Sequence, residues 1–257
     1  MIKEEIKFQN SCIFEGMTSI RAIIKSIDEN IGDRRIEKIL FDESKFEKIK
    51  KEIGYFKAVS EKYGFSLEQI TSFELENITL GNSHGGIVAI CSKRNIPKLD
   101  DSVKIEENGF YAMIEGIEDP YNFGYALRSL YATGCSGIIL PERNWMSAAG
   151  VVCRSSAGAS ELFPIYSADA IYTADFFKRK NYTIVCADTR TECVLGKCEL
   201  KKPILLIIGG EKRGISKKLL DKCDIKVKID YSRDFAASLS AASAATIFAY
   251  EIMRQNS

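Results

Sequence analysis

The chain has 257 residues, of which 46% are hydrophobic and 28% charged, and its formal net charge is +1. This composition is typical of a soluble globular protein with one large or two small domains, and it excludes the disordered and fibrous classes. No apolar run reaches the roughly 20 residues of a membrane span, and the start lacks the apolar core of a signal peptide. We therefore expect a cytoplasmic protein.

Eight cysteines and one histidine limit the chemistry that side chains can supply. The cysteines include no Cys-x-x-Cys pair and lie mostly in apolar or mixed segments, so we expect reduced, structural thiols. The single histidine, His84, leaves little room for a His-based metal site or a Ser-His-Asp triad. Such a residue is more often a turn or core histidine than a ligand. We expect no metal site.

The first hundred residues show the mixed periodicity of a small α/β unit. The expected elements are a helix around 17–30, a strand at 36–41, a charged helix at 44–62 and an apolar strand at 86–91. A polar, proline-bearing stretch at 95–108 then interrupts the apolar pattern and predicts a linker. We therefore expect two domains, at residues 1–100 and 107–257.

After this stretch, strands and helices alternate, which predicts a parallel sheet with helices on its faces. The expected strands, all apolar, lie at 111–115, 137–140, 182–187, 204–208 and 225–229. The expected helices lie at 122–133, near 148–155 and at 235–254. In the last helix, alanines recur every fourth residue from Ala237 to Ala249. They form a narrow face that favours an interface, either internal or between subunits.

Three short motifs fall where an apolar strand meets a turn or a helix start, the place where open α/β sheets bind ligands. They are Asn-Phe-Gly-Tyr-Ala-Leu-Arg at 122–128, Gly-Gly-Glu-Lys-Arg-Gly at 209–214 and Ala-Ser-Leu-Ser-Ala-Ala at 237–242. In the first, Asn122 is expected to cap a helix, and Arg128, six residues later, to address the same pocket mouth. In the second, the glycines leave backbone groups open to a ligand.

A basic stretch follows the second motif. Between residues 212 and 228, seven lysines and arginines stand against two aspartates. Such a run, taken alone, is more often a solvated helix face than a binding surface. Its position beside a candidate ligand loop favours contact with phosphates.

In order and spacing, the three motifs resemble the signatures of the SpoU/TrmH family, the RNA 2'-O-ribose methyltransferases of the SPOUT class. The resemblance implies an α/β fold whose C-terminal parallel-sheet domain forms a trefoil knot, binds S-adenosylmethionine and dimerises through helices. It also implies a small α/β, L30e-like RNA-binding domain before it, matched by residues 16–20 and 84–89, although Gly85 replaces the usual glutamine. Ribosomal RNA is the expected substrate, and transfer RNA is the alternative.

The resemblance further assigns roles to residues of this chain. Catalytic roles fall to Arg128, Asn122, Glu211 and Ser238, cofactor contacts to Gly209, Gly210, Ile229, Leu239 and Ser240, and RNA contacts to Arg154, Ser156, Lys212 and Arg213. Because arginine is almost never deprotonated, we expect Arg128 to grip a phosphate and stabilise a developing alkoxide as a cation. Ser240 stands where the family has asparagine, and it has less reach and one donor fewer.

Two other classes of protein remain open. The altered third motif is compatible with a non-catalytic RNA-binding protein of the same fold, which methyl transfer to any RNA would exclude. The glycine turns are also compatible with an α/β enzyme that binds a nucleotide, and competition by NAD or ATP against the methyl donor would reveal this. Glu211 makes a phosphate loop less attractive, because it adds negative charge.

Overall fold

The computed structural model describes residues 12–80, 84–141, 148–210, 214–234 and 236–257. The chain separates into two compact units, the first from Met1–Asn95 with Asn144–Leu162 and the second from Ile96–Arg143 with Phe163–Ser257. The first passage between units lies at the expected linker. The expected second domain, however, is interrupted by a segment that packs with the first unit. The functional boundaries at 100 and 107 stay a prediction.

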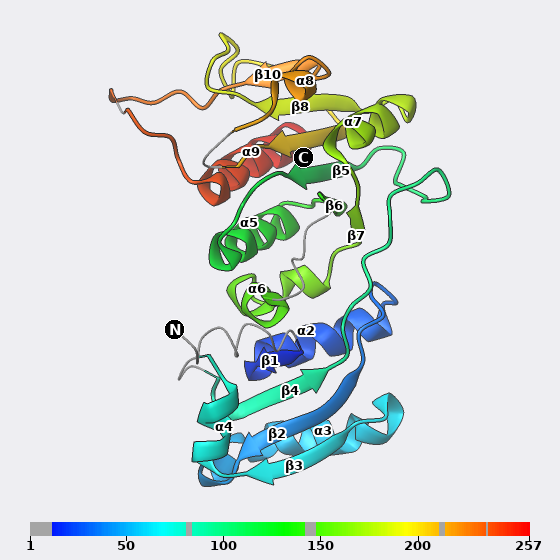
Figure 1. Ribbon diagram of the computed structural model, residues 1–257, viewed down its shortest axis with the longest axis vertical. Coiled ribbons are helices and arrows are strands. Elements are labelled where there is room, and N and C mark those ends of the chain that lie inside the picture. Colours follow the sequence, from blue (N-terminus) through cyan, green and yellow to red (C-terminus); the bar gives the residue numbers. More distant parts are fainter. Residues whose placement is uncertain (1–11, 81–83, 142–147, 211–213, 235) are drawn as a thin grey trace. The chain divides into compact units, whose positions relative to one another are not determined.

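The first unit is built on a sheet that has four strands among the described residues, in the order β1, β4, β2, β3 (Figure 1). β1 (Ile13–Glu15) and β2 (Ile36–Asp42) flank β4 (Ile87–Cys91) in antiparallel pairs, and β3 (Ser66–Ile70) pairs with β2 in parallel. The sequence predicted β2 and β4 from their apolar runs. β1 has only three residues, and β3 has no buried residue, so apolar periodicity did not reveal them.

Helices cover both faces of this sheet. α2 (Gly16–Asp28) and α3 (Lys50–Tyr63) pack on one face, and the 3-10 helix η1 (Glu43–Ile49) leads into α3. α4 (Ser72–Ile78) covers the other face through Leu75. The helices expected at 17–30 and 44–62 are therefore present, the second one divided into a 3-10 and an α-helical part.

One segment of the first unit comes from far along the chain. α6 (Ala149–Ser155) and the 3-10 helix η3 (Ala159–Glu161) both pack against α2, and α6 also packs against β1. A Cβ atom on Gly150 would lie 2.0 Å from the carbonyl oxygen of Ile13, a distance that no side chain tolerates. Glycine is therefore required where α6 crosses β1.

A buried ion pair fixes this segment within the first unit. Arg34 Nε donates to Glu161 Oε2 at 2.9 Å, and the two side chains are 2% and 4% exposed. The same guanidinium donates to the carbonyl of Ser92 and lies 4.4 Å from the ring centroid of Phe14. A second buried arginine, Arg94, donates to a carbonyl oxygen of the same segment. Charge and hydrogen-bond partners are thus matched inside this unit.

The second unit contains, within the described part of the chain, a six-stranded sheet in the order β10, β8, β9, β5, β6, β7 (Figure 1). All five strand pairs are parallel. The strands are β5 (Phe110–Ile114), β6 (Gly137–Leu140), β7 (Ile165–Ser167), β8 (Thr183–Ala187), β9 (Ile204–Ile208) and β10 (Ile225–Val227). The predicted α/β fold with a parallel sheet is confirmed. The trefoil knot stays a prediction.

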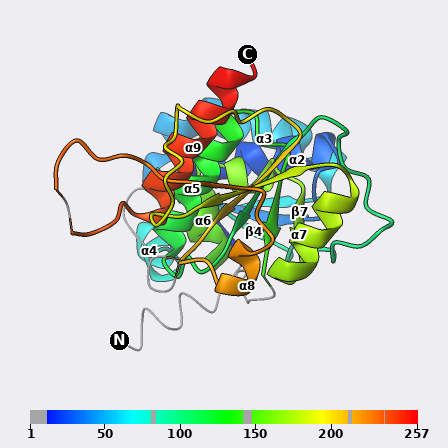
Figure 2. The same cartoon turned by 90° about the horizontal axis from the view of Figure 1, so that it is seen from above.

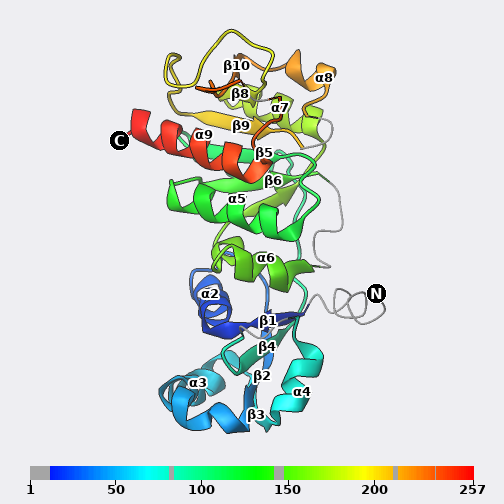
Figure 3. The same ribbon diagram turned by 90° about the vertical axis from the view of Figure 1, so that its left-hand side faces the viewer.

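The helices of the second unit form a layer on each side of its sheet. α5 (Pro120–Ala132) and α9 (Ala241–Gln255) lie side by side on one face (Figures 2 and 3). α7 (Ala170–Arg179) and α8 (Lys217–Leu220) pack on the opposite face, in a cluster with buried strand residues such as Met113. The last helix begins at 241, later than the expected 235.

The alanine face of α9 is used inside the unit. Ala241, Ala245 and Ala249 are buried, so this small-residue face allows close internal packing with α5 and β9 rather than contact with another subunit. The hydroxyl of Thr246 also donates to Ser129 on α5 at 2.7 Å. Of the two interfaces that the sequence left open, the structure shows the internal one.

One pair of cysteines differs from the sequence expectation. Cys186 on β8 and Cys223, after α8, form a disulfide, so the prediction of reduced thiols is wrong for this pair. Cys135 and Cys153 remain buried free thiols, and burial raises the pKa of each to about 12. These two are inert structural residues, because thiolate formation is suppressed.

Candidate functional site

A cavity of about 710 Å³ lies in the second unit. Its walls come from residues that follow β8, β9 and β10, and from α8 and the first turns of α9. Because these strands are parallel, their carboxyl ends share one edge of the sheet, which is where open α/β folds bind ligands. The apolar part of the wall consists of Ile208, Ile215, Val227, Ile229, Leu239 and Phe248.

The second motif forms the cavity floor through Gly209 and Gly210. A Cβ atom on Gly209 would lie 2.5 Å from the carbonyl carbon of Gly214, and one on Gly210 would lie 2.7 Å from the carbonyl oxygen of Gly116. The glycines are therefore required by the close approach of neighbouring backbone, and not only by open space for a ligand. A larger residue at either position would distort the turn itself, so it would not test ligand binding cleanly.

The strand that leads to the first motif ends beside this glycine turn, because Gly116 follows β5 and adjoins Gly210. Asp119, and not Asn122, caps α5: its carboxylate accepts from the backbone N–H of Asn122 at 2.9 Å, with Pro120 in the first turn. This corrects the predicted cap, and proline at that position favours the same start. Arg128 is exposed on α5 and does not line the cavity.

The third motif supplies one side of the cavity through Ser238 and Leu239. The N–H of Leu239 donates to the hydroxyl of Tyr231 at 3.1 Å, which fixes the loop that carries both residues. Ser240 does not line the cavity. Its hydroxyl caps α9 by accepting from the N–H of Ser243 at 3.2 Å, the role that serine commonly has at a helix start.

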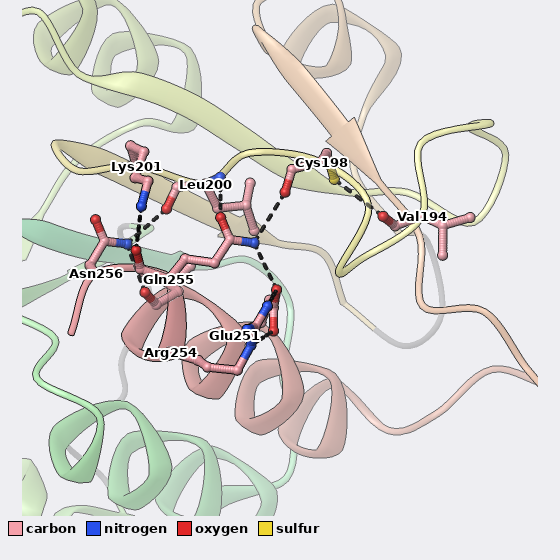
Figure 4. A network of polar contacts seen from close by, with 9 residues as sticks. Val194, Cys198, Leu200, Lys201, Glu251, Arg254, Gln255 and Asn256 are labelled. Carbon is pink, nitrogen blue, oxygen red and sulfur yellow. Dashed lines mark hydrogen bonds and ion pairs between the residues drawn. The ribbon is translucent and has the colours of Figure 1, made fainter.

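The far end of α9 is fastened to the loop before β9 (Figure 4). The amide of Gln255 accepts from the N–H of Leu200 at 2.8 Å and donates to the carbonyl of Cys198 at 3.1 Å. It also donates to Glu251, which forms a two-point ion pair with Arg254. This network holds the helix whose other end forms a cavity wall.

Several cavity residues were not predicted from the sequence. Asp188, Thr189 and Arg190 follow β8, and Arg190 pairs with Asp188 at 3.1 Å. Tyr231 belongs to the loop before the third motif. The available signal was the end of an apolar strand followed by polar residues, but only the order β10, β8, β9 places that end beside the glycine turn.

The remaining predicted residues lie elsewhere. Glu211, Lys212 and Arg213 fall outside the described residues. Arg154 and Ser156 belong to the first unit, where Arg154 forms an ion pair with Glu15. Ser156 is buried, its hydroxyl donates to the carbonyl of Cys153 and accepts from the N–H of Ser160, and its side chain is therefore not exposed to a nucleic acid.

His84, in the first unit, has a structural role. It is buried, and its Nδ1 accepts from the backbone N–H of Gly86 at 3.1 Å. Burial, together with the nearby charge of Lys45, lowers its pKa. A neutral histidine that closes a local turn agrees with the interpretation of His84 as a turn residue. Among the described helices, none is long and apolar enough to cross a membrane.

Comparisons with known proteins find a family whose matched region contains all three motifs. The SpoU rRNA Methylase family matches residues 109–250. A 23S rRNA (guanosine-2'-O-)-methyltransferase, RlmB of Shewanella oneidensis, is 28% identical over 95% of this chain and 97% of its own length. A putative TrmH family tRNA/rRNA methyltransferase of Bacillus subtilis, YacO, is 26% identical over 87% of this chain and 90% of its length.

The fold itself is also found among solved structures. The crystal structure of an AdoMet-bound rRNA methyltransferase from Sinorhizobium meliloti superposes with a TM-score of 0.75, over 95% of this chain and 87% of that one. Sequence identity in that comparison is 21%, so it establishes the shared fold alone. The similarity extends over both compact units, because nearly the whole chain is covered.

Proposed function

Because the chain belongs to the SpoU rRNA methylase family, we propose that it transfers a methyl group from S-adenosylmethionine to a ribose 2'-hydroxyl of RNA. The observation that carries this proposal is the convergence of the second and third motifs on one cavity, with the end of β5, the strand that precedes the first motif, beside the glycine turn. Ribosomal RNA is the first candidate substrate, as for the Shewanella relative, and transfer RNA is the second.

The cavity has the donor set that such a cofactor needs. Backbone groups at Gly209 and Gly210 are accessible, Ile229 and Leu239 offer apolar surface, and Ser238 offers a hydroxyl. Its volume falls within the range of about 300 to 1,000 Å³ that is usual for sites of small ligands. S-adenosylmethionine supplies an electrophilic methyl group when bound. The methyl acceptor, by contrast, comes from the RNA, and the protein must position and activate it.

Arg128 is the residue that we assign to the acceptor. A ribose hydroxyl is a poor nucleophile at neutral pH, so positioning and local positive charge must lower the barrier. Arg128 is exposed and forms no ion pair among the described residues, which leaves its guanidinium open to a phosphate. We assign Asn122 and Glu211 to orienting the arginine and the ribose, and Ser238 to holding the substrate.

The RNA contacts are shared between the units in this proposal. Arg154 remains a candidate, because its side chain is 34% exposed although it pairs with Glu15. Lys212 and Arg213 stay candidates from the sequence. We propose that residues 1–100 form the L30e-like reader of RNA shape and that residues 107–257 form the knotted methyltransferase domain. Ser156 is no longer a candidate contact, because its side chain is buried.

We further propose a homodimer in the cytoplasm. α5 exposes Tyr121 and Tyr125, and α9 exposes Ile247 and Tyr250, so two packed helices share an apolar surface. Such a surface is self-complementary under a two-fold axis. Sedimentation of the full-length protein should give twice the mass of one chain, and Tyr250→Glu should give the mass of one chain with its helix content retained.

The test of the proposed reaction is methyl transfer by the full-length protein. Ribosomal and transfer RNA from a strain that lacks the gene should be incubated with labelled S-adenosylmethionine, and the label located by resistance of the 2'-O-methylated linkage to alkali. We expect one labelled site in ribosomal RNA. Label in transfer RNA alone would select the alternative substrate, and label on a base would contradict the assigned acceptor.

The same preparation tests the two other classes of protein. A non-catalytic RNA-binding protein would shift RNA in a gel but transfer no methyl group. An enzyme for nucleotides would release S-adenosylmethionine when NAD or ATP is added. Either outcome would overturn the proposed reaction, while the family membership would stand.

A further inference from the structure

The cavity has more positive charge than its proposed cofactor can use. Arg190, Lys217, Lys226 and Lys228 contribute to its wall, against the carboxylates of Asp188 and Asp221. Arg190 is already paired with Asp188. Among the described residues, no ion pair engages the three lysines.

Two lysines near the cavity are paired with carboxylates. Lys222 pairs with Asp175 at 2.6 Å, and Lys178 pairs with Asp224 at 2.8 Å, yet neither lysine lines the cavity. The lysines on the cavity wall face one unpaired carboxylate, that of Asp221.

Two of these lysines are held at one end of the sheet. Lys226 belongs to β10, and Lys228 directly follows this strand. The hydroxyl of Thr191 donates to the carbonyl of Lys226, and the N–H of Lys228 donates to the carbonyl of Cys193. Both lysines are half-buried, which reduces the screening of their charge by solvent.

This positive charge affects the binding of the methyl donor more than the binding of the demethylated product. At neutral pH, S-adenosylmethionine carries a sulfonium, an ammonium and one carboxylate, so its net charge is positive. S-adenosylhomocysteine lacks the sulfonium and is neutral overall. The carboxylate can satisfy at most one lysine, so the remaining positive charge repels the donor more than the product. An anion beside the cavity would remove this penalty.

We propose that Lys217, Lys226 and Lys228 form a binding site for an RNA phosphate. A phosphate bound there changes the cavity from one that binds the product more tightly to one that binds the donor more tightly. The proposal rests on the proposed function, because it takes the cavity to be the cofactor site. A phosphodiester supplies the missing negative charge, and ribose methylation requires one next to the acceptor. Donor affinity and RNA affinity must then increase together, by reciprocity of linked binding.

Calorimetry on the full-length protein at low salt tests the charge effect. We expect the product to bind more tightly than the donor in the absence of RNA. The double variant Lys226→Gln and Lys228→Gln should shift the donor-to-product affinity ratio toward the donor by about tenfold. Each removed charge should contribute roughly threefold. Lys218→Gln is the matched control, since Lys218 belongs to the same α8 but does not line the cavity, and it should leave the ratio unchanged.

The same ratio measured with anions identifies the occupant. A short mixed-sequence RNA should shift the ratio of the wild type toward the donor, and should have little effect on the double variant. Inorganic phosphate at the same phosphate concentration should have little effect on either. If inorganic phosphate shifts the affinity ratio as much as RNA does, the site binds a free anion, and the RNA part of the proposal is overturned.

Failure of this proposal can be told apart from failure of the proposed function. Binding of both ligands with the same ratio in wild type and double variant would overturn the charge linkage alone. Absence of binding by both ligands, in every form of the protein, would overturn the cofactor assignment and the linkage with it. Neither result depends on a catalytic assay.

Discussion

The two compact units differ in how their charged side chains are paired. In the first unit, the buried Arg34 has an acidic partner, Glu161, at 2.9 Å, and the buried Arg94 donates to a carbonyl oxygen. In the second unit, lysines line a cavity without forming an ion pair to a protein carboxylate in the described structure. Matched buried charges fix a conformation, whereas unmatched charges at a cavity await a ligand. Pairing, rather than burial alone, therefore separates structural from functional charge here.

The largest effect is expected when the matched pair is broken. Glu161→Ala leaves the guanidinium of Arg34 buried without its partner, so the free energy of unfolding of the first unit should fall by about 3 to 5 kcal/mol. Urea denaturation, combined with hydrogen exchange of α2, measures this change.

The matched control removes both charges. Arg34→Met with Glu161→Leu should recover most of the lost stability, because apolar residues of similar volume replace a buried pair at little cost. A single variant as stable as the wild type would show that Glu161 does not compensate the charge of Arg34.

The second prediction concerns an exposed charge in the second unit. Arg128→Ala should reduce methyl transfer by about 10² to 10³-fold, the usual loss when one group that stabilises transition-state charge is removed. Donor affinity should stay unchanged, because Arg128 does not line the cavity. Single-turnover transfer and calorimetry measure the two quantities.

Arg128→Lys tests whether methyl transfer needs the planar guanidinium or only a positive charge. We expect it to be nearly as inactive as the alanine variant, because lysine cannot form a two-point contact with a phosphate. Near-native turnover of the lysine variant would contradict the assigned role of the guanidinium.

A smaller effect is expected at two helix caps in the second unit. Asp119→Ala removes a side chain that accepts from one backbone N–H at the start of α5, and Asp169→Ala removes one that accepts from two at the start of α7. Each should cost about 1 kcal/mol of stability. Thermal unfolding should therefore respond similarly, while methyl transfer should fall only for Asp119→Ala, because α5 carries Asn122 and Arg128 of the first motif. Equal loss of methyl transfer in both variants would contradict the expected difference between the two helix caps.

The smallest effect is expected from acid. Hydrogen bonds from Arg254 and then Gln255 lower the pKa of Glu251 to about 2 from its ordinary 4.5. Because the folded-state value lies below the unfolded one, this contribution is complete above about pH 4.5 and is lost as the pH falls toward about 2. Melting temperatures across this range should fall less steeply for Glu251→Gln than for the wild type. Parallel slopes would show that the network in Figure 4 adds no acid-sensitive stability.

The sequence predicted best the elements that are apolar throughout. The bounds expected for β6 and β9, 137–140 and 204–208, are those observed, because a strand buried on both faces has no polar interruption. α7 was not predicted, although Asp169 caps it. The expected start of the last helix at 235 is too early, because the alanine-rich pattern continues through Ala236 and Ala237, where the chain forms a loop.

The cavity could be predicted only in part. Gly209, Gly210 and Leu239 were identified from motifs, because their chemistry is local to each motif. Asp188 was not, since it depends on the pairing of distant segments, which places β8 between β9 and β10. Likewise, the sequence around Ser156 resembled an RNA-facing segment, but long-range packing buried it.

The segment around α6 has a consequence for exchanging modules between relatives. The chain leaves the first unit at Asn95, returns to it at Asn144 and leaves again after Leu162. A hybrid gene with one crossover near residue 100 would combine α6 from one parent with α2 and β1 from another, so the contact at Gly150 would join foreign surfaces. A transplant of the first unit therefore needs three crossovers, and a single crossover cannot exchange the two units.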